Sequence, residues 1–148
     1  MVSGTRDQPA EILQIEDNPV DVMITKEALN EGKIWNNLHV VEDGEEAMDF
    51  LHKRGKYSHA SSPDIILLDL NLPRKDGREV LAEIKGDPSL RHIPVIILTT
   101  SEDEDDISSS YEQQANCFIT KPVDMEQFTR VLEFIGNFWF EVAQLPRH

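Results

Sequence analysis

The sequence predicts one α/β domain built on a doubly wound, five-stranded parallel sheet with helices on both faces. Five short runs rich in Val, Ile and Leu recur at intervals of about 25 to 30 residues, and the segments between them carry apolar residues at helical spacing. The 148 residues match the size of one ordinary domain. Because parallel strands are joined by right-handed crossovers, this alternation favours three layers, with the sheet in the middle.

The five apolar runs are each too short for a buried helix, and their apolar residues do not alternate strictly with polar ones. This pattern is typical of strands that are buried on both faces, as in a parallel sheet. In chain order, the expected strands cover residues 12–15, 38–41, 65–68, 95–98 and 118–119.

The helices are expected between the strands. Their apolar stripes are Val20, Met23, Ile24 and Ala28 in the first, Ala47, Phe50 and Leu51 in the second, Val80, Leu81 and Ile84 in the third, and Ile107 and Tyr111 in the fourth. Asn18 before Pro19 predicts the start of the first helix, and Gly32 predicts its end. Asp43 and Asp124 are placed to cap the second and fifth helices.

Composition and charge exclude several classes of partner and location. The 28 acidic residues outnumber the 14 basic ones, so that the net charge of −14 would repel a nucleic acid backbone. No apolar run is long enough to span a membrane, and residues 1–10 have neither the basic start nor the apolar stretch of a secretory signal. The single cysteine, Cys117, can form neither an internal disulfide nor a cysteine-rich zinc site. We therefore expect a cytoplasmic protein without membrane or nucleic acid partners.

Polar residues stand immediately after, or within two residues of, the ends of four of the predicted strands. Glu16 and Asp17 follow the first, Asp69 the third, Thr99 the fourth and Lys121 the fifth. The carboxyl ends of parallel strands meet at one edge of the sheet, where α/β proteins bind their ligands. Three carboxylates crowded together there require a cation, and oxygen ligands of this kind select Mg²⁺-like metals.

The same cluster suits the formation of an aspartyl phosphate. The carboxylate of Asp69 is a nucleophile, Lys121 supplies positive charge for the phosphoryl oxygens, and Thr99 supplies a hydroxyl donor. Taken singly, each residue has an ordinary explanation as a loop cap, a strand end or a solvated lysine. Four separate loops would have to match by accident for all of these explanations to hold together.

These residues resemble the signature of CheY-like response regulator receiver domains. The resemblance rests on Glu16-Asp17, on the stretch DLNLPRKDG at residues 69–77, on Thr99 and on Lys121-Pro122, and it extends over about residues 11–140. It implies a flavodoxin-like sheet with strand order 2-1-3-4-5. The receiver domain is then expected at 11–145, including an extended C-terminal helix, with a flexible tail at 1–10 and a short tail at 146–148.

The resemblance implies a role for each site residue. Asp69 would be the phosphoacceptor. Mg²⁺ or Mn²⁺ would be held by Asp17, Asp69 and the backbone carbonyl of Asn71, with Glu16 acting through water. Lys121 and Thr99 would bind the phosphoryl oxygens, Thr99 and Phe118 would form the switch, and Asn71 and Ser101 would tune the rate of water attack. The protein would be a signalling switch rather than an enzyme, which accepts a phosphoryl group from a histidine kinase. Its only catalysis would be Mg²⁺-dependent self-phosphorylation from a phosphodonor and slow self-dephosphorylation.

A closer resemblance is to the single-domain regulators that partner cyanobacterial and bacterial phytochromes. It rests on LLDLNLP at residues 67–73, on LTTS at 98–101, and on Phe138-Trp139 and Leu145-Pro146. The resemblance implies a phytochrome-type kinase as the partner and a homodimer built on the last helix. That helix is expected from about residue 125 past Trp139, with its dimer contact formed by Phe134, Phe138, Trp139 and Phe140.

Three alternative functions use parts of the same pattern. A phosphorelay intermediate would pass its phosphoryl group on to a phosphotransfer protein, and chain length does not separate it from a terminal receiver. A phosphorylation-independent pseudo-receiver would lack an acidic, Thr or Lys position, and all of these are present. A phosphatase of the dehalogenase type requires a second carboxylate two residues after Asp69, where this chain has Asn71.

Overall fold

The computed structural model describes residues 9–99, 117–121 and 124–144, with the side chains of Thr99 and of residues 135–144 left out. The fourth expected helix, with Ile107 and Tyr111, lies outside the described residues. Among the helices that are described, none is long and apolar enough to cross a lipid bilayer.

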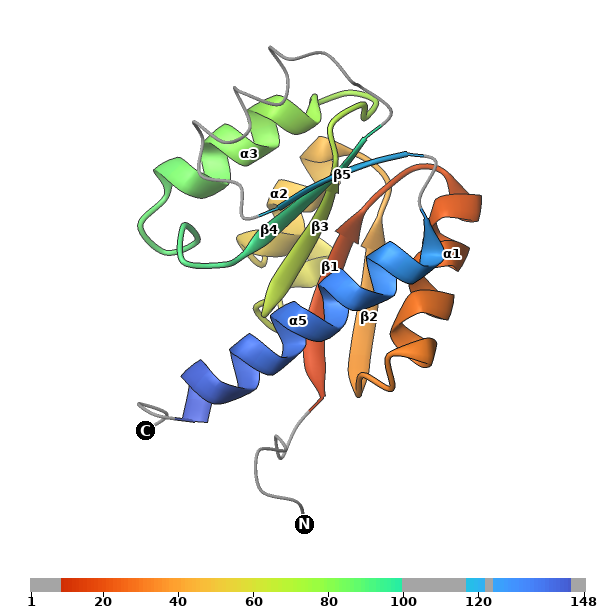
Figure 1. Ribbon diagram of the computed structural model, residues 1–148. Coiled ribbons are helices and arrows are strands. Elements are labelled where there is room, and N and C mark those ends of the chain that lie inside the picture. The colour runs from red at the N-terminus through yellow and green to blue at the C-terminus, as the bar shows by residue number, and fades with distance from the viewer. Residues whose placement is uncertain (1–8, 100–116, 122–123, 145–148) are drawn as a thin grey trace.

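The described strands form one parallel sheet in the order β2-β1-β3-β4-β5 (Figure 1). The strands are β1 (Ala10–Ile15), β2 (Asn36–Val41), β3 (Ile65–Asp69), β4 (Val95–Thr99) and β5 (Cys117–Thr120). β1 lies between β2 and β3, so that Ile12 pairs with Leu38 on one side and with Ile65 on the other. The predicted fold class and strand order are confirmed.

Helices cover both faces of this sheet. They are α1 (Pro19–Glu31), α2 (Gly44–Leu51), α3 (Gly77–Gly86) and α5 (Met125–Gln144), and a short 3₁₀ helix, η1 (Gly55–Tyr57), follows α2. α1 and α5 lie on one face, and α2 and α3 lie on the other (Figure 1). The strand order reverses between β1 and β3, and the crevice of such a sheet lies at the carboxyl ends of these strands.

The core is divided by the alternation of side chains along each strand. Leu13 and Ile15 of β1 join the cluster under α2 and α3. Ile12 of the same strand joins the cluster under α1 and α5, where Phe128 and Leu132 of α5 are buried. Both faces of β1 are therefore buried, which explains why the sequence of this strand shows no strict alternation.

The buried face of α1 differs from the expectation. Val20 and Met23, predicted as part of its apolar stripe, are 60% and 59% exposed. The side chains buried against the sheet are Thr25, Ala28 and Leu29. A threonine is tolerated there because its hydroxyl donates a hydrogen bond to the backbone carbonyl of Asp21, at 3.1 Å, so that no polar group is left unpaired.

The predicted helix caps are confirmed. Asn18 accepts a hydrogen bond from the backbone N–H of Val20, ahead of Pro19 in the first turn of α1. Asp43 accepts from Glu46 at the start of α2, and Asp124 accepts from Glu126 at the start of α5. These caps satisfy backbone donors that have no partner within the helix.

Candidate functional site

Four of the five predicted site residues are brought together at the carboxyl edge of the sheet. Glu16 and Asp17 follow β1, Asp69 ends β3, and Lys121 follows β5. Glu16 and Asp69 are 1% and 6% exposed, whereas Asp17 is open to solvent. Each of these three acidic side chains offers an oxygen within 4.8 Å of those of the other two. A search of the described part of the chain for three or more acidic, His or Cys side chains that could hold a metal ion together finds this one group.

The ammonium group of Lys121 lies at the centre of the site. Its Nζ donates to Glu16 Oε1 at 2.8 Å, to Asp21 Oδ2 at 2.8 Å and to Asp69 Oδ2 at 3.3 Å. The Lys121 side chain is 7% exposed, so that these bonds are largely shielded from water. A lysine ammonium has three N–H donors, and the three carboxylates therefore use all of them.

Asp21 is the site residue that sequence reasoning missed. It lies in the first turn of α1, where an acidic residue has an ordinary explanation as a favourable charge near the helix N-terminus. The available signal was its spacing. Asp21 stands four residues after Asp17, and a helix that begins at Pro19 carries it back toward the end of β1.

The crowding of charges shifts two pKa values. Burial of the carboxyl, together with the neighbouring Asp69, raises the pKa of Glu16 to about 7, against the opposing effect of Lys121. Burial by itself would lower the pKa of Lys121, but its hydrogen bonds to Asp21 and Glu16 outweigh burial and raise it. Lys121 is therefore positively charged at every physiological pH, whereas Glu16 titrates near neutrality when no metal is bound.

The loop after β3 holds the Asp69 carboxylate in place. The backbone N–H of Asn71 donates to Asp69 Oδ1 at 2.9 Å, while Oδ2 of the same carboxylate faces Lys121. The loop closes through a bond of 3.0 Å from the N–H of Gly77 to the carbonyl of Leu70. Gly77 lies so close to the backbone of Asp69 and Leu70 that any Cβ atom at this position would overlap with it. The glycine thus allows the close approach of backbone that fixes this loop.

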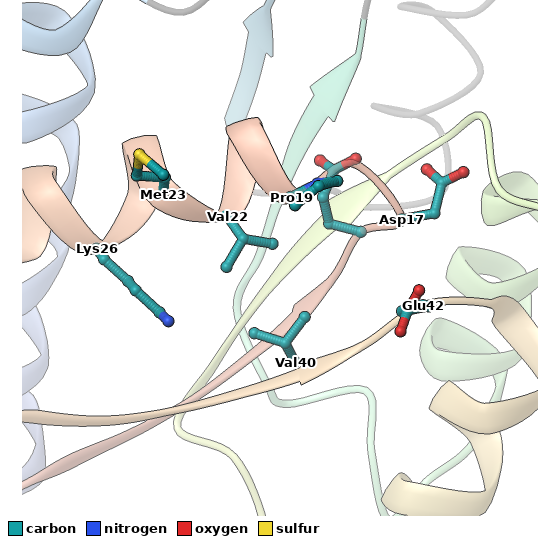
Figure 2. A pocket seen from close by; sticks show the side chains of 8 residues that line it. Asp17, Pro19, Val22, Met23, Lys26, Val40 and Glu42 are labelled. Carbon is teal, nitrogen blue, oxygen red and sulfur yellow. The ribbon is translucent and has the colours of Figure 1, made fainter.

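A groove of about 520 Å³ opens beside the acidic residues. It runs between α1 and β2, and Figure 2 shows Val22 of the helix and Val40 of the strand pointing toward one another across it. Met23 and Lys26 of α1 line the same groove. An apolar surface therefore adjoins the acidic site.

The remaining predicted site residues are only partly described. Thr99 ends β4 and pairs in register with Thr120, but its side chain is not described. Phe118 of β5 is half-buried and packs against the core under α2 and α3. Ser101 lies outside the described residues, as do the side chains of Phe138, Trp139 and Phe140. Phe134, the remaining member of the expected dimer contact, is 72% exposed.

The donor set fits a Mg²⁺ or Mn²⁺ ion. Glu16, Asp17 and Asp69 offer oxygen atoms alone, and small hard divalent cations prefer such ligands. The exposed Asp17 leaves one side of the cluster open to water, which Mg²⁺ retains in its coordination shell. A contribution from the backbone carbonyl of Asn71 stays a prediction.

Comparison with known proteins gives one consistent result. The response regulator receiver domain family matches residues 12–133, a range that includes every member of the acidic site and Lys121. The response regulator Rcp1 of Synechocystis sp. is 44% identical over 145 residues, which cover 98% of this chain and 99% of Rcp1. The probable methanogenesis regulatory protein FilR2 of Methanothrix harundinacea is 37% identical, covering 95% of this chain and 90% of FilR2.

Solved structures of similar proteins share the fold. The phosphorylated cyanobacterial phytochrome response regulator RcpA has a TM-score of 0.80 at 48% identity, covering 93% of this chain and 99% of its own. The Mn²⁺-bound form of Rcp1 has a TM-score of 0.80 at 46% identity, with the same coverage of 93% and 99%. The bacteriophytochrome response regulator AtBRR has a TM-score of 0.75 at 43% identity, covering 89% and 96%.

Proposed function

Since this chain belongs to the response regulator receiver family, whose members accept a phosphoryl group on an aspartate, we propose that Asp69 is the acceptor here. The observation that carries this proposal is the position of its carboxylate. Asp69 Oδ2 lies 3.3 Å from the Lys121 ammonium, and the same side chain belongs to the acidic cluster that could hold a metal ion. Positive charge can therefore be supplied from two directions to a phosphoryl group on Asp69.

In the proposed reaction, one carboxylate oxygen of Asp69 attacks the phosphorus atom of a phosphohistidine on the kinase. The new O–P bond forms as the P–N bond breaks, and the bonding electron pair leaves with the imidazole nitrogen. The Lys121 ammonium donates to an oxygen of the transferred group, and the Thr99 hydroxyl is proposed to donate to another. When bound, Mg²⁺ or Mn²⁺ supplies further positive charge to the phosphoryl oxygens.

Acetyl phosphate tests the acceptor without a kinase. We expect the wild type to gain the mass of one phosphoryl group when incubated with Mg²⁺ and acetyl phosphate, and Asp69→Asn to gain none. Asp49→Asn is the matched control, because it removes the same charge from an exposed position on α2 and should leave labelling unchanged. Full labelling of Asp69→Asn would contradict the assignment, and an unlabelled wild type would favour a pseudo-receiver.

The phosphodonor is proposed to be a histidine kinase of the phytochrome type. This rests on the similarity to RcpA and AtBRR, which are described as phytochrome and bacteriophytochrome response regulators. The groove beside the site offers a docking surface for such a kinase, since the exposed Met23 lines it together with Glu16 and Asp17, which lie at the site that the donor must reach. A cytoplasmic location, where such a kinase would act, stays a prediction.

Docking and chemistry can be separated by the choice of donor. Met23→Gln should slow transfer from a phosphorylated phytochrome kinase and leave labelling by acetyl phosphate unchanged, because Met23 is exposed on α1 and is not among the residues proposed to bind the metal ion or the phosphoryl group. Ile34→Val, a small change at a partly buried position, provides a control for general effects on packing. Equal rates of kinase-dependent transfer in Met23→Gln and wild type would contradict docking through this groove.

The switch and the dimer complete the proposal. Phe118 and Thr99 are proposed to rearrange together after phosphorylation, and Asn71 and Ser101 to set the rate of water attack. Receiver boundaries at 11–145 and a homodimer through α5 are proposed as well. The high exposure of Phe134, at 72%, supports the dimer because interfaces favour aromatic anchors.

Light scattering tests the homodimer. Replacing Phe134 with Ser should convert a dimeric mass to a monomeric one at micromolar concentration, while labelling of Asp69 by acetyl phosphate continues. A monomeric mass for the wild type, both with and without phosphorylation, would rule the dimer out.

A further inference from the structure

We propose that Asp21 is a positioning residue for phosphoryl transfer, which orients the Lys121 ammonium so that its third N–H faces Asp69. Asp21 lies outside the residues that carry the family resemblance. The inference deepens the proposed function and depends on Asp69 being the acceptor. The hydrogen bond between Lys121 and Asp21, on which the inference rests, forms without a metal ion.

Asp21 and Glu16 accept hydrogen bonds of equal length from the Lys121 ammonium. Both carboxylates accept from Lys121 Nζ at 2.8 Å, whereas the distance to Asp69 is 3.3 Å. The Asp21 side chain is 15% exposed, and this partial burial strengthens a charge-assisted hydrogen bond relative to one in open water. Two of the three N–H groups of Lys121 are therefore held firmly, and the third has the longest and most easily exchanged contact.

Asp21 is itself held in place by the start of α1. The cap at Asn18 and the proline at position 19 begin the helix, and the carbonyl of Asp21 accepts a hydrogen bond from the buried Thr25 hydroxyl at 3.1 Å. The helix thus acts as a fixed support from which Asp21 reaches the lysine. Without the hydrogen bond to Asp21, Glu16 would be the one remaining partner that holds the Lys121 ammonium, apart from the proposed acceptor Asp69.

This arrangement divides the site between two tasks. Glu16, Asp17 and Asp69 form the acidic cluster suited to a metal ion, and Asp21 is not a member of it. Asp21 contacts Lys121 instead, and Lys121 contacts the acceptor. Fixing a charged donor where negative charge develops lowers the cost of reorganisation during the reaction, so that the loss of Asp21 should slow transfer more than it weakens metal binding.

The test compares three variants of the full chain. Asp21→Ala removes the hydrogen-bond acceptor, Asp21→Asn keeps an acceptor oxygen without the charge, and Glu27→Gln removes one charge from an exposed position on the same helix. Three quantities are measured: the labelling rate constant with acetyl phosphate at saturating Mg²⁺, the Mg²⁺ affinity by calorimetry, and the ¹⁵N-edited NMR signal of the Lys121 ammonium. Hydrogen bonds that slow exchange with water make that signal visible.

We expect Asp21→Ala to be labelled about tenfold more slowly than the wild type, with its Lys121 ammonium signal lost. Asp21→Asn should retain the signal and a rate within about threefold of the wild type, and Glu27→Gln should match the wild type in every respect. The Mg²⁺ affinity of both Asp21 variants should change by less than about threefold, because the lost charge is not a ligand.

Several results would overturn the proposal. These are a wild-type rate with a retained ammonium signal in Asp21→Ala, an Asn variant as slow as the Ala variant, or a loss of Mg²⁺ affinity that accounts for the slower rate. Failure of the underlying function would look different, because the wild type would then be unlabelled or Asp69→Asn would be labelled. The NMR signal reports on Asp21 and Lys121 in either case.

Discussion

Glu16 is expected to destabilise the folded protein at neutral and higher pH when no metal is bound. Its carboxyl is 1% exposed and lies beside Asp69, and burial raises its pKa from 4.5 to about 7. A carboxyl whose pKa is higher in the folded state than in the unfolded chain binds its proton more tightly when folded. The contribution of the protonated Glu16 carboxyl to the unfolding free energy is fully present below pH 4.5 and is lost as the pH rises through about 7.

The magnitude follows from these two pKa values. A tenfold difference in an acid dissociation constant is worth about 1.4 kcal/mol, so that full ionisation of Glu16 costs about 3 kcal/mol of unfolding free energy. In Glu16→Gln this position is neutral at every pH and still offers an acceptor oxygen to Lys121. Between pH 5 and pH 8, the wild type should therefore lose about 2.5 kcal/mol relative to Glu16→Gln.

Urea unfolding in EDTA, at constant ionic strength and followed by circular dichroism, measures this difference. Glu42→Gln is the control, since it removes the same charge from an exposed position that lines the adjacent groove, and its difference from the wild type should not depend strongly on pH. If the stability difference between Glu16→Gln and the wild type is the same at pH 5 and pH 8, the reasoning about this buried carboxyl is wrong.

Three further predictions concern the core, the loop after β3 and the metal. Gln14 is fully buried in β1, and its side-chain amide has no hydrogen-bond partner among the described residues. Gln14→Met should therefore raise the unfolding free energy by about 1 kcal/mol in urea titrations. A loss of stability would indicate that the amide is paired. Gly77→Ala should lower stability by about 2 kcal/mol and slow labelling by acetyl phosphate, because its methyl group would overlap the backbone of Asp69; unchanged kinetics would contradict this. At a concentration of about 100 times its dissociation constant, Mg²⁺ should stabilise the wild type by about 2.7 kcal/mol, measured as a rise in the thermal midpoint. Asp17→Asn should lose most of that rise, and equal rises in the two proteins would exclude Asp17 as a ligand.

The strands and caps were predictable because their causes are local. A run such as residues 65–68 is apolar at every position, and only a strand with two covered faces buries all of these side chains. The cap at Asn18 is likewise a contact between neighbours in the chain, at a sequence separation of two residues. The apolar stripe of α1 was predicted only in part, because Ile24 and Ala28 pack against the core whereas Val20 and Met23, at the same helical spacing, are largely exposed.

The sequence by itself determined which chemical groups reach the carboxyl edge of the sheet. Glu16, Asp17, Asp69 and Lys121 each stand at or just after the end of a recognisable strand, and in a parallel sheet the carboxyl ends of all strands meet there. Only the tertiary structure decided that Asp21 shares the ammonium of Lys121, a residue 100 positions away in the chain. The physical reason is that the apolar pattern of a strand depends on residues that are neighbours in the chain. The partner of a buried charge depends instead on how a separate helix is rotated and packed against the sheet.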